Sequence, residues 1–256
     1  MTKKDFKKIL FATLGTIAAV QLVLPSVLMA QNAQSADNLA KAFCTRLSMI
    51  SSELDQRFAD RQAKILARQT ERLNNLAERR SDRDAKLTEK RSQWDARRNQ
   101  LYAKLEVKAK TDSQKQAITA FKAAVDAAVA TRKAAVDAAI SSFRQGLDQA
   151  IATRKAAVDA AVNAYKSAAQ TARGQALADC SAGIAAKTIR DSYRASMKAA
   201  RDKFQNDKQA IDKLGETASS LALIRQQAVE KALQDFKAAL ETARDNLKAA
   251  FPADSQ

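Results

Sequence analysis

Histidine is absent from the 256-residue chain. Its absence excludes Ser-His-Asp triads, Cys-His pairs and the common zinc sites that use imidazole ligands. The chain also has no GxxxxGKS/T loop, no GxGxxG loop and no EF-hand loop, and no pattern gathers its carboxylates in a cleft. We therefore expect a protein that is not an enzyme, with no cofactor, no metal site, no catalytic residue and no small-molecule substrate.

Helix breakers and aromatic residues are also scarce. The chain has five glycines, 5% aromatic residues and two prolines, which lie near its ends at Pro25 and Pro252. Apolar residues make up 46%, but many are alanines, which form helices well and fill a core poorly. The composition predicts an all-α protein of long helices packed in thin assemblies of two or three.

The N-terminus has the three-part layout of a signal peptide. A basic segment precedes an apolar run that begins at Ile9 and ends near Pro25, and Ala30 follows as the best cleavage residue. We expect residues 1–30 to be a signal peptide cleaved after Ala30 and the rest to be exported to the periplasm or exterior. The alternative is an uncleaved membrane anchor, because residues 9–30 are long enough to span a bilayer. The basic residues of this segment are Lys3, Lys4, Lys7 and Lys8.

Two cysteines, Cys44 and Cys180, follow this segment. In an exported protein such a pair favours a disulfide, although free or intermolecular thiols stay open as the alternative. The midpoint between them falls on Thr111-Asp112-Ser113, the clearest cluster of cap and turn residues in the middle of the chain. The sequence thus predicts a long antiparallel helical hairpin over residues 37–180, turning near 111–113 and closed by the disulfide.

Eleven-residue repeats run through the second half of this predicted hairpin. FKAAVDAAVAT begins at Phe121 and is followed by RKAAVDAAISS, FRQGLDQAIAT and RKAAVDAAVNA, with a degenerate fifth copy from Tyr165. Eleven residues take nearly three α-helical turns, so the pattern keeps a narrow apolar stripe almost straight along the helix. Each of the first four repeats also spaces a base and an acid at i, i+4: Lys122 and Asp126, Lys133 and Asp137, Arg144 and Asp148, Lys155 and Asp159.

The first half keeps the same period, with apolar residues at Phe43, Leu54, Ile65, Leu76 and Leu87. If the two halves pair antiparallel with their apolar layers opposite each other, the same register places Cys44 opposite Cys180 to within one residue. Eleven-residue repeats occur in lipid-coating helices too, but those need a wide apolar face. The narrow stripe favours helix–helix packing, and the expected fold is an elongated, antiparallel, coiled-coil-like hairpin.

The C-terminal third predicts a second, shorter helical hairpin over residues 184–251, with a tail at 252–256. Its turn is expected near 214–217, with Gly215 as a C-cap followed by a new N-cap at Thr217. Whether Gly183 breaks the preceding helix stays open.

Basic residues exceed acidic ones by 16 over the chain. Between residues 79 and 98 they form a candidate anion-binding face, although the interleaved Asp82, Asp84, Glu89 and Asp95 are usual for a solvated surface. Trp94 is the lone aromatic there, and it shares its place in the eleven-residue unit with Ile50, which favours seam packing. The candidate face comprises Arg79, Arg80, Arg83, Lys86, Lys90, Arg91, Arg97 and Arg98.

Export, helical repeats and the cysteine register together favour a structural spacer or interaction scaffold of the cell envelope or exterior. One alternative is a periplasmic holdase, because export, basic charge and helical arms are similar to the Skp-type chaperones, although the trimerising strands of that family are missing. Another is a weak binder of an anionic polymer, either nucleic acid or a wall polymer. The protein partner is unknown, and a homo-oligomer stays open.

Overall fold

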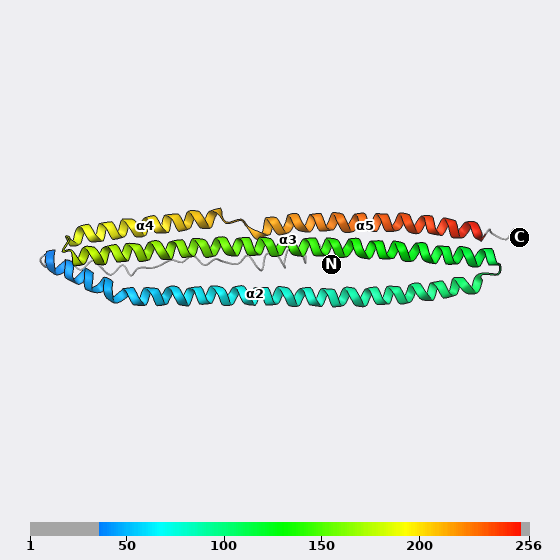
Figure 1. Cartoon of the computed structure of the whole chain (residues 1–256), viewed down its shortest axis with the longest axis horizontal. Coiled ribbons are helices and arrows are strands. Elements are labelled where there is room, and N and C mark those ends of the chain that lie inside the picture. Colours follow the sequence, from blue (N-terminus) through cyan, green and yellow to red (C-terminus); the bar gives the residue numbers. More distant parts are fainter. Residues whose placement is uncertain (1–35, 252–256) are drawn as a thin grey trace. The chain divides into compact units, whose positions relative to one another are not determined.

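A computed structural model describes residues 36–251, with side chains from residue 42 onward. About 95% of these residues are helical, and this part of the chain contains no strand. The helices are α2 (Ala36–Lys108), α3 (Asp112–Ser181), α4 (Ala186–Ala210) and α5 (Leu214–Ala250) (Figure 1). The prediction of an all-helical chain is confirmed. The predicted signal peptide at 1–30 and the tail at 252–256 lie outside the described residues.

The connection between α2 and α3 lies at residues 109–111, beside the predicted turn cluster. The Thr111 hydroxyl accepts a hydrogen bond from the Gln114 backbone N–H at 3.2 Å, and the Gln114 side-chain oxygen accepts one from the Thr111 N–H at 3.3 Å. This reciprocal pair is a capping box, which satisfies backbone donors that the first turn of a helix leaves unpaired. Thr111 therefore acts as the N-cap that starts α3.

Gly183 ends α3 and decides the open question of the helix break. It has φ +71°, which is the left-handed region that side chains with a Cβ rarely adopt. The Gly183 N–H donates to the Cys180 carbonyl and the Ile184 N–H donates to the Asp179 carbonyl, at 3.2 and 3.1 Å. These two bonds form a Schellman motif, so the helix stops before Gly183 instead of running through it.

The connection between α4 and α5 differs in detail from the prediction. α4 is capped by Ile211 in an extended conformation, and α5 begins at Leu214. Gly215 thus lies in the first turn of α5 and is not a C-cap. One carbonyl of the connection, that of Asp212, accepts a hydrogen bond from Arg154. A side-chain donor and an extended residue therefore make this turn, without a left-handed glycine.

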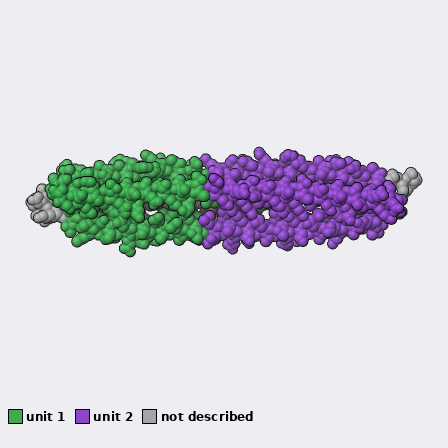
Figure 2. Space-filling model, viewed as in Figure 1, with its two compact units in different colours: residues 1–72, 150–215 green, residues 73–149, 216–256 purple. Residues whose placement is uncertain are grey.

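The described helices fall into two compact units (Figure 2). Unit 1 contains the chain up to residue 72 and residues 150–215, and unit 2 contains residues 73–149 and the chain from 216 onward. Each unit includes a segment of α2 and a segment of α3; α4 belongs to unit 1, and α5 from Glu216 belongs to unit 2. This division differs from the predicted pairing of residues 184–251 with one another. The alanines of α3 leave apolar surface beside the narrow stripe, and a third helix covers it in each unit.

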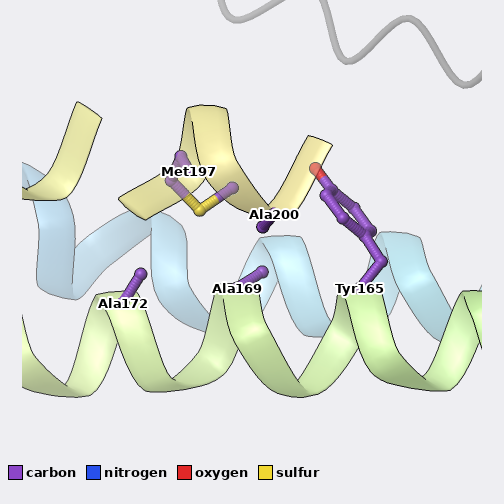
Figure 3. Close-up of a cluster of buried hydrophobic side chains, with 5 residues drawn as sticks. All are labelled: Tyr165, Ala169, Ala172, Met197 and Ala200. Atoms are coloured by element: carbon purple, nitrogen blue, oxygen red, sulfur yellow. The ribbon is translucent and has the colours of Figure 1, made fainter. Parts of the chain in front are cut away.

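In unit 1, three helices contribute to the apolar core. Tyr165, Ala169 and Ala172 of α3 face Met197 and Ala200 of α4 (Figure 3), and Phe58 of α2 packs against the same cluster. Small alanines on both helices allow the close approach that buries the larger tyrosine and methionine.

In unit 2, the buried cluster joins Tyr102 of α2, Val125 of α3 and Ala243 of α5. α5 also lies against the middle of α3, where the Leu221 methyls approach the backbone of Gly146. A Cβ placed at Gly146 would lie only 2.8 Å from Leu221 Cδ2. The glycine inside α3 therefore serves close helix packing at this point.

Candidate anion-binding face

The predicted disulfide is present in unit 1. Cys44 of α2 and Cys180 of α3 are bonded, with their Cα atoms 5.9 Å apart, within the range that a disulfide spans. Both half-buried cysteines pack on the buried side chains of Leu47, Ala176 and Ile189. The bond thus ties α2 to α3 where α4 also contributes to the core.

Three of the eight candidate cations pair with carboxylates of α3 within unit 2. Arg80 donates two hydrogen bonds to Asp148, at 2.8 and 3.0 Å. Arg91 does the same to Asp137, at 2.7 and 3.1 Å. The third, Arg98, forms ion pairs with Asp95 of its own helix at 2.7 Å and with Asp126 of α3 at 2.9 Å. These three arginines hold helices together, because their charge is directed at α3.

A second set of ion pairs runs beside the first with the charges reversed. Here α2 supplies the acids and α3 the bases: Asp84 with Arg144 at 2.5 Å, Asp95 with Lys133 at 2.7 Å and Glu106 with Lys122 at 2.6 Å. The steps from Arg80 to Arg91 and from Asp84 to Asp95 to Glu106 are eleven residues along α2, and each is matched by eleven in the opposite direction along α3. Arg98 departs from this spacing, because it follows Arg91 by seven residues. We call the two sets together the charge ladder.

The charge ladder changes the expected partners of the repeat charges. Lys133 and Arg144 reach across to α2 and do not pair with the acid four residues later. Lys155 does pair with Asp159 in its own helix, at 2.5 Å. Eleven residues before Asp84 and Arg80, α2 carries Leu73 and Gln69, which offer no charge. The intrahelical pair forms where no partner of opposite charge is supplied from α2.

The ladder also shifts ionisation equilibria in unit 2. The hydrogen bond from Arg144 lowers the pKa of Asp84, and the hydrogen bonds from Lys133 and Arg98 lower the pKa of Asp95. Tyr102 donates a hydrogen bond to Asp126 at 3.0 Å. Burial is the main cause, and this bond the second, that raises the pKa of Tyr102 to about 12. Asp84 and Asp95 are therefore charged, and Tyr102 is neutral, at neutral pH.

Four other candidate cations lie on a separate, exposed face of α2. They follow one another at intervals of seven, four and seven residues, close to whole helical turns, so they share one side of the helix. None of them forms an ion pair with another described residue. Half-buried Arg83 lies between the ladder and this face, near Arg225. We call the four residues the outer row: Arg79, Lys86, Lys90 and Arg97.

Trp94 lies beside the outer row and is 49% exposed. Ile50, which occupies the same place in the eleven-residue unit, packs in the core around Leu47 and Ile189. Ile50 is thus packed in a core, whereas half of the Trp94 side chain is open to solvent, so the seam packing predicted for Trp94 is incomplete.

A small cavity of the described residues is lined by none of the candidate cations. That cavity lies in unit 1 between Phe58, Arg173 and Met197, and its volume of about 20 Å³ suffices for about one water molecule. Residues 36–251 contain no group of three or more potential metal ligands among their acids and cysteines. None of the described helices is long and apolar enough to cross a bilayer.

Sequence reasoning missed two sets of contacts, one between α2 and α3 and the other between α3 and α5. Buried Arg173 of α3 donates hydrogen bonds to the Ser51 carbonyl at 2.9 Å and to Asp55 at 2.6 Å, both on α2. In unit 2, Arg132 lies over the ring of Phe236, and Arg225 lies over the ring of Phe143, at 5.0 and 4.7 Å from the ring centres.

The ring contacts of Arg132 and Arg225 and the charge ladder each had a signal in the sequence. α3 alternates aromatic and basic residues at the first repeat position, and α5 carries the complementary Arg225 and Phe236 eleven residues apart. Opposite charges also recur every eleven residues in α2 and α3. Matching charge periods between helices, in addition to apolar ones, would have found the ladder.

Comparisons with models of protein families, with curated proteins and with solved structures give no match to this chain.

Proposed function

We propose that the chain is an exported, non-enzymatic, coiled-coil-like protein that acts as a structural spacer or interaction scaffold in the cell envelope or exterior. The observation that carries the proposal is the charge ladder, which repeats every eleven residues and pairs α2 with α3 in one register. A repeating unit of this kind lets length change in whole repeats without changing the contacts. The disulfide supports the extracytoplasmic part of the proposal, because such bonds persist in oxidising compartments.

The spacer proposal predicts an elongated particle. A 73-residue helix is about 110 Å long at about 1.5 Å per residue. Size-exclusion chromatography with light scattering, combined with small-angle X-ray scattering, should therefore give a maximum dimension of about 110 Å or more and should report the stoichiometry. A compact particle of the same mass would reject the spacer.

Length variants test whether the repeat sets that dimension. Deleting eleven facing residues from each of α2, α3 and α5 should shorten the particle by about 16 Å and preserve cooperative melting. Deleting nine residues from each is the matched control, because nine residues are about two and a half turns and rotate the apolar stripe away from its partners. If both deletions melt alike, the eleven-residue register does not organise the protein.

Export is tested separately in the native cells. Fractionation should recover the protein outside the cytoplasm with a mass that starts after Ala30, and deletion of residues 2–30 should retain it in the cytoplasm. A mature mass that includes residues 1–30 would indicate the uncleaved anchor instead.

A further inference from the structure

The outer row is a line of cations whose charge the fold does not use. The ladder pairs Arg80, Arg91 and Arg98 with carboxylates, whereas the outer row lies on the exposed side of the same helix segment. From Arg79 to Arg97 the row covers about 27 Å along the helix axis. Four like charges on one face repel one another, so a bound anion would stabilise them.

The geometry of the row selects among anions. A small anion is held by donors that converge on one point, and these side chains instead follow a line. An anionic membrane would face the flanks of the row as well, where exposed Glu78, Asp82 and Glu89 would be repelled. A membrane-surface helix also needs a wide apolar face, which this side of α2 lacks. A narrow chain of negative charges can follow the row and avoid the acids.

Trp94 adds a flat apolar surface at the edge of the row. It lies one helical turn from both Lys90 and Arg97, and half of its side chain is exposed. Sites for flexible phosphodiester chains combine a basic track with an aromatic ring on which a base stacks. The exposed tryptophan is therefore placed to contact a group carried by the same chain that the cations bind.

We propose that Arg79, Lys86, Lys90 and Arg97, with Trp94 at their edge, form a salt-sensitive binding track for the backbone of a linear phosphodiester polymer. Nucleic acid and phosphodiester wall polymers share this chemistry. The track is independent of the spacer function, since its four cations form no ion pair with another described residue.

The test compares two triple variants that remove the same charge. Lys86→Gln, Lys90→Gln and Arg97→Gln remove three of the four charges of the outer row, and Arg80→Gln, Arg91→Gln and Arg98→Gln remove the three ladder arginines of α2. Binding of a labelled oligothymidylate of about 20 nucleotides is measured by anisotropy over a salt series with the purified full chain. The outer-row variant should bind about tenfold more weakly at low salt, and its slope of log affinity against log salt should be less steep by about two.

The ladder variant should keep the wild-type salt slope and lose thermal stability, whereas the outer-row variant should keep its melting temperature. Equal losses of affinity in the two variants would show that binding depends only on the net charge of the protein and would overturn the proposal. Absence of binding to the wild-type protein at low salt would overturn it too.

An abasic oligonucleotide with the same backbone identifies the source of the polymer. Quenching of Trp94 fluorescence and tighter binding by oligothymidylate alone would indicate nucleic acid, and both effects should be lost in Trp94→Leu. Equal binding of both probes would support a track that recognises the backbone, as a wall polymer requires. Binding of both probes that survives the outer-row substitutions would place the site elsewhere and reject the track.

Discussion

Two glycines inside α3 show how the cost of one missing methyl depends on its surroundings. Gly146 faces the methyls of Leu221, whereas Gly174 is exposed and nothing lies within 4 Å of the position where its Cβ would stand. Glycine destabilises a helix interior relative to alanine by about 0.5–1 kcal/mol. At Gly146 this cost is offset by the close approach of α5, and at Gly174 no compensating contact exists.

We therefore predict that Gly174→Ala raises the free energy of unfolding by about 0.5–1 kcal/mol. Gly146→Ala should give no such gain, because the new Cβ would meet Leu221 at 2.8 Å. Urea titrations followed by circular dichroism measure both values.

A Leu221→Ala background provides the control for the glycine prediction. With the leucine methyls removed, Gly146→Ala should stabilise as Gly174→Ala does. If Gly146→Ala already stabilises the wild-type chain fully, then the leucine moves aside freely and the close contact does not explain the glycine.

Among the helices, the charge ladder determines register more than it adds stability. Each ion pair of the ladder is partly exposed, and pairs of this kind contribute about 0.2–1 kcal/mol to stability. A four-residue slip of α3 along α2 could, however, place like charges opposite each other at several positions of the ladder, because the base and the acid lie four residues apart in each helix. The penalty for the wrong register is therefore larger than the gain from any one pair.

The ladder predicts an acid-sensitive component of stability. Hydrogen bonds from Arg144 and Lys133 lower the folded-state pKa values of Asp84 and Asp95 below the ordinary value of 3.8. The stabilisation is thus present above pH 3.8 and is lost as the pH falls through the lower folded-state values. Thermal melts between pH 7 and pH 2 at low salt should show this loss, and Asp84→Asn with Asp95→Asn should reduce it.

Asp245→Asn is the control for the acid prediction, because this exposed carboxylate lies 3.7 Å from Lys248 and takes no part in the ladder. Its pH profile should follow that of the wild type. High salt should weaken the difference between the Asp84→Asn, Asp95→Asn variant and the wild type, since the ion pairs of the ladder are partly open to solvent. If the Asp84→Asn, Asp95→Asn variant loses stability in acid as the wild type does, the ladder is not the source of that loss.

Local signals in the sequence predicted the helices well, and contacts between helices were harder to predict. Scarce glycine and proline forecast the long helices, and Thr111 with Gln114 starts α3 through a pattern visible in four residues. Gly215 misled because glycine marks a C-cap only when its φ is positive, which the residue type alone does not determine. The third helix escaped prediction because alanine faces look alike whether they pack on one helix or on two.

At the scale of the whole molecule, the disulfide is the one covalent link between segments distant in sequence that the described residues contain. It joins cysteines separated by 136 positions. Closing a loop of that size restricts the unfolded chain, and the chain-entropy model gives about 5 kcal/mol, an upper figure if helices persist after unfolding. All of the core that surrounds the bond belongs to unit 1.

We predict that Cys44→Ser with Cys180→Ser lowers the melting temperature and that unit 1 carries the loss. Hydrogen exchange should accelerate most at the amides near Leu47, Ala176 and Ile189, which pack around the bond, and least near the capping box at Thr111. Reducing the wild-type protein should reproduce the double variant, and adding reductant to the variant should change nothing further. Free thiols in protein taken from its native compartment would contradict the prediction, as would uniform acceleration along the chain. In the latter case, the bond would act only through the unfolded state and would give unit 1 no stability of its own.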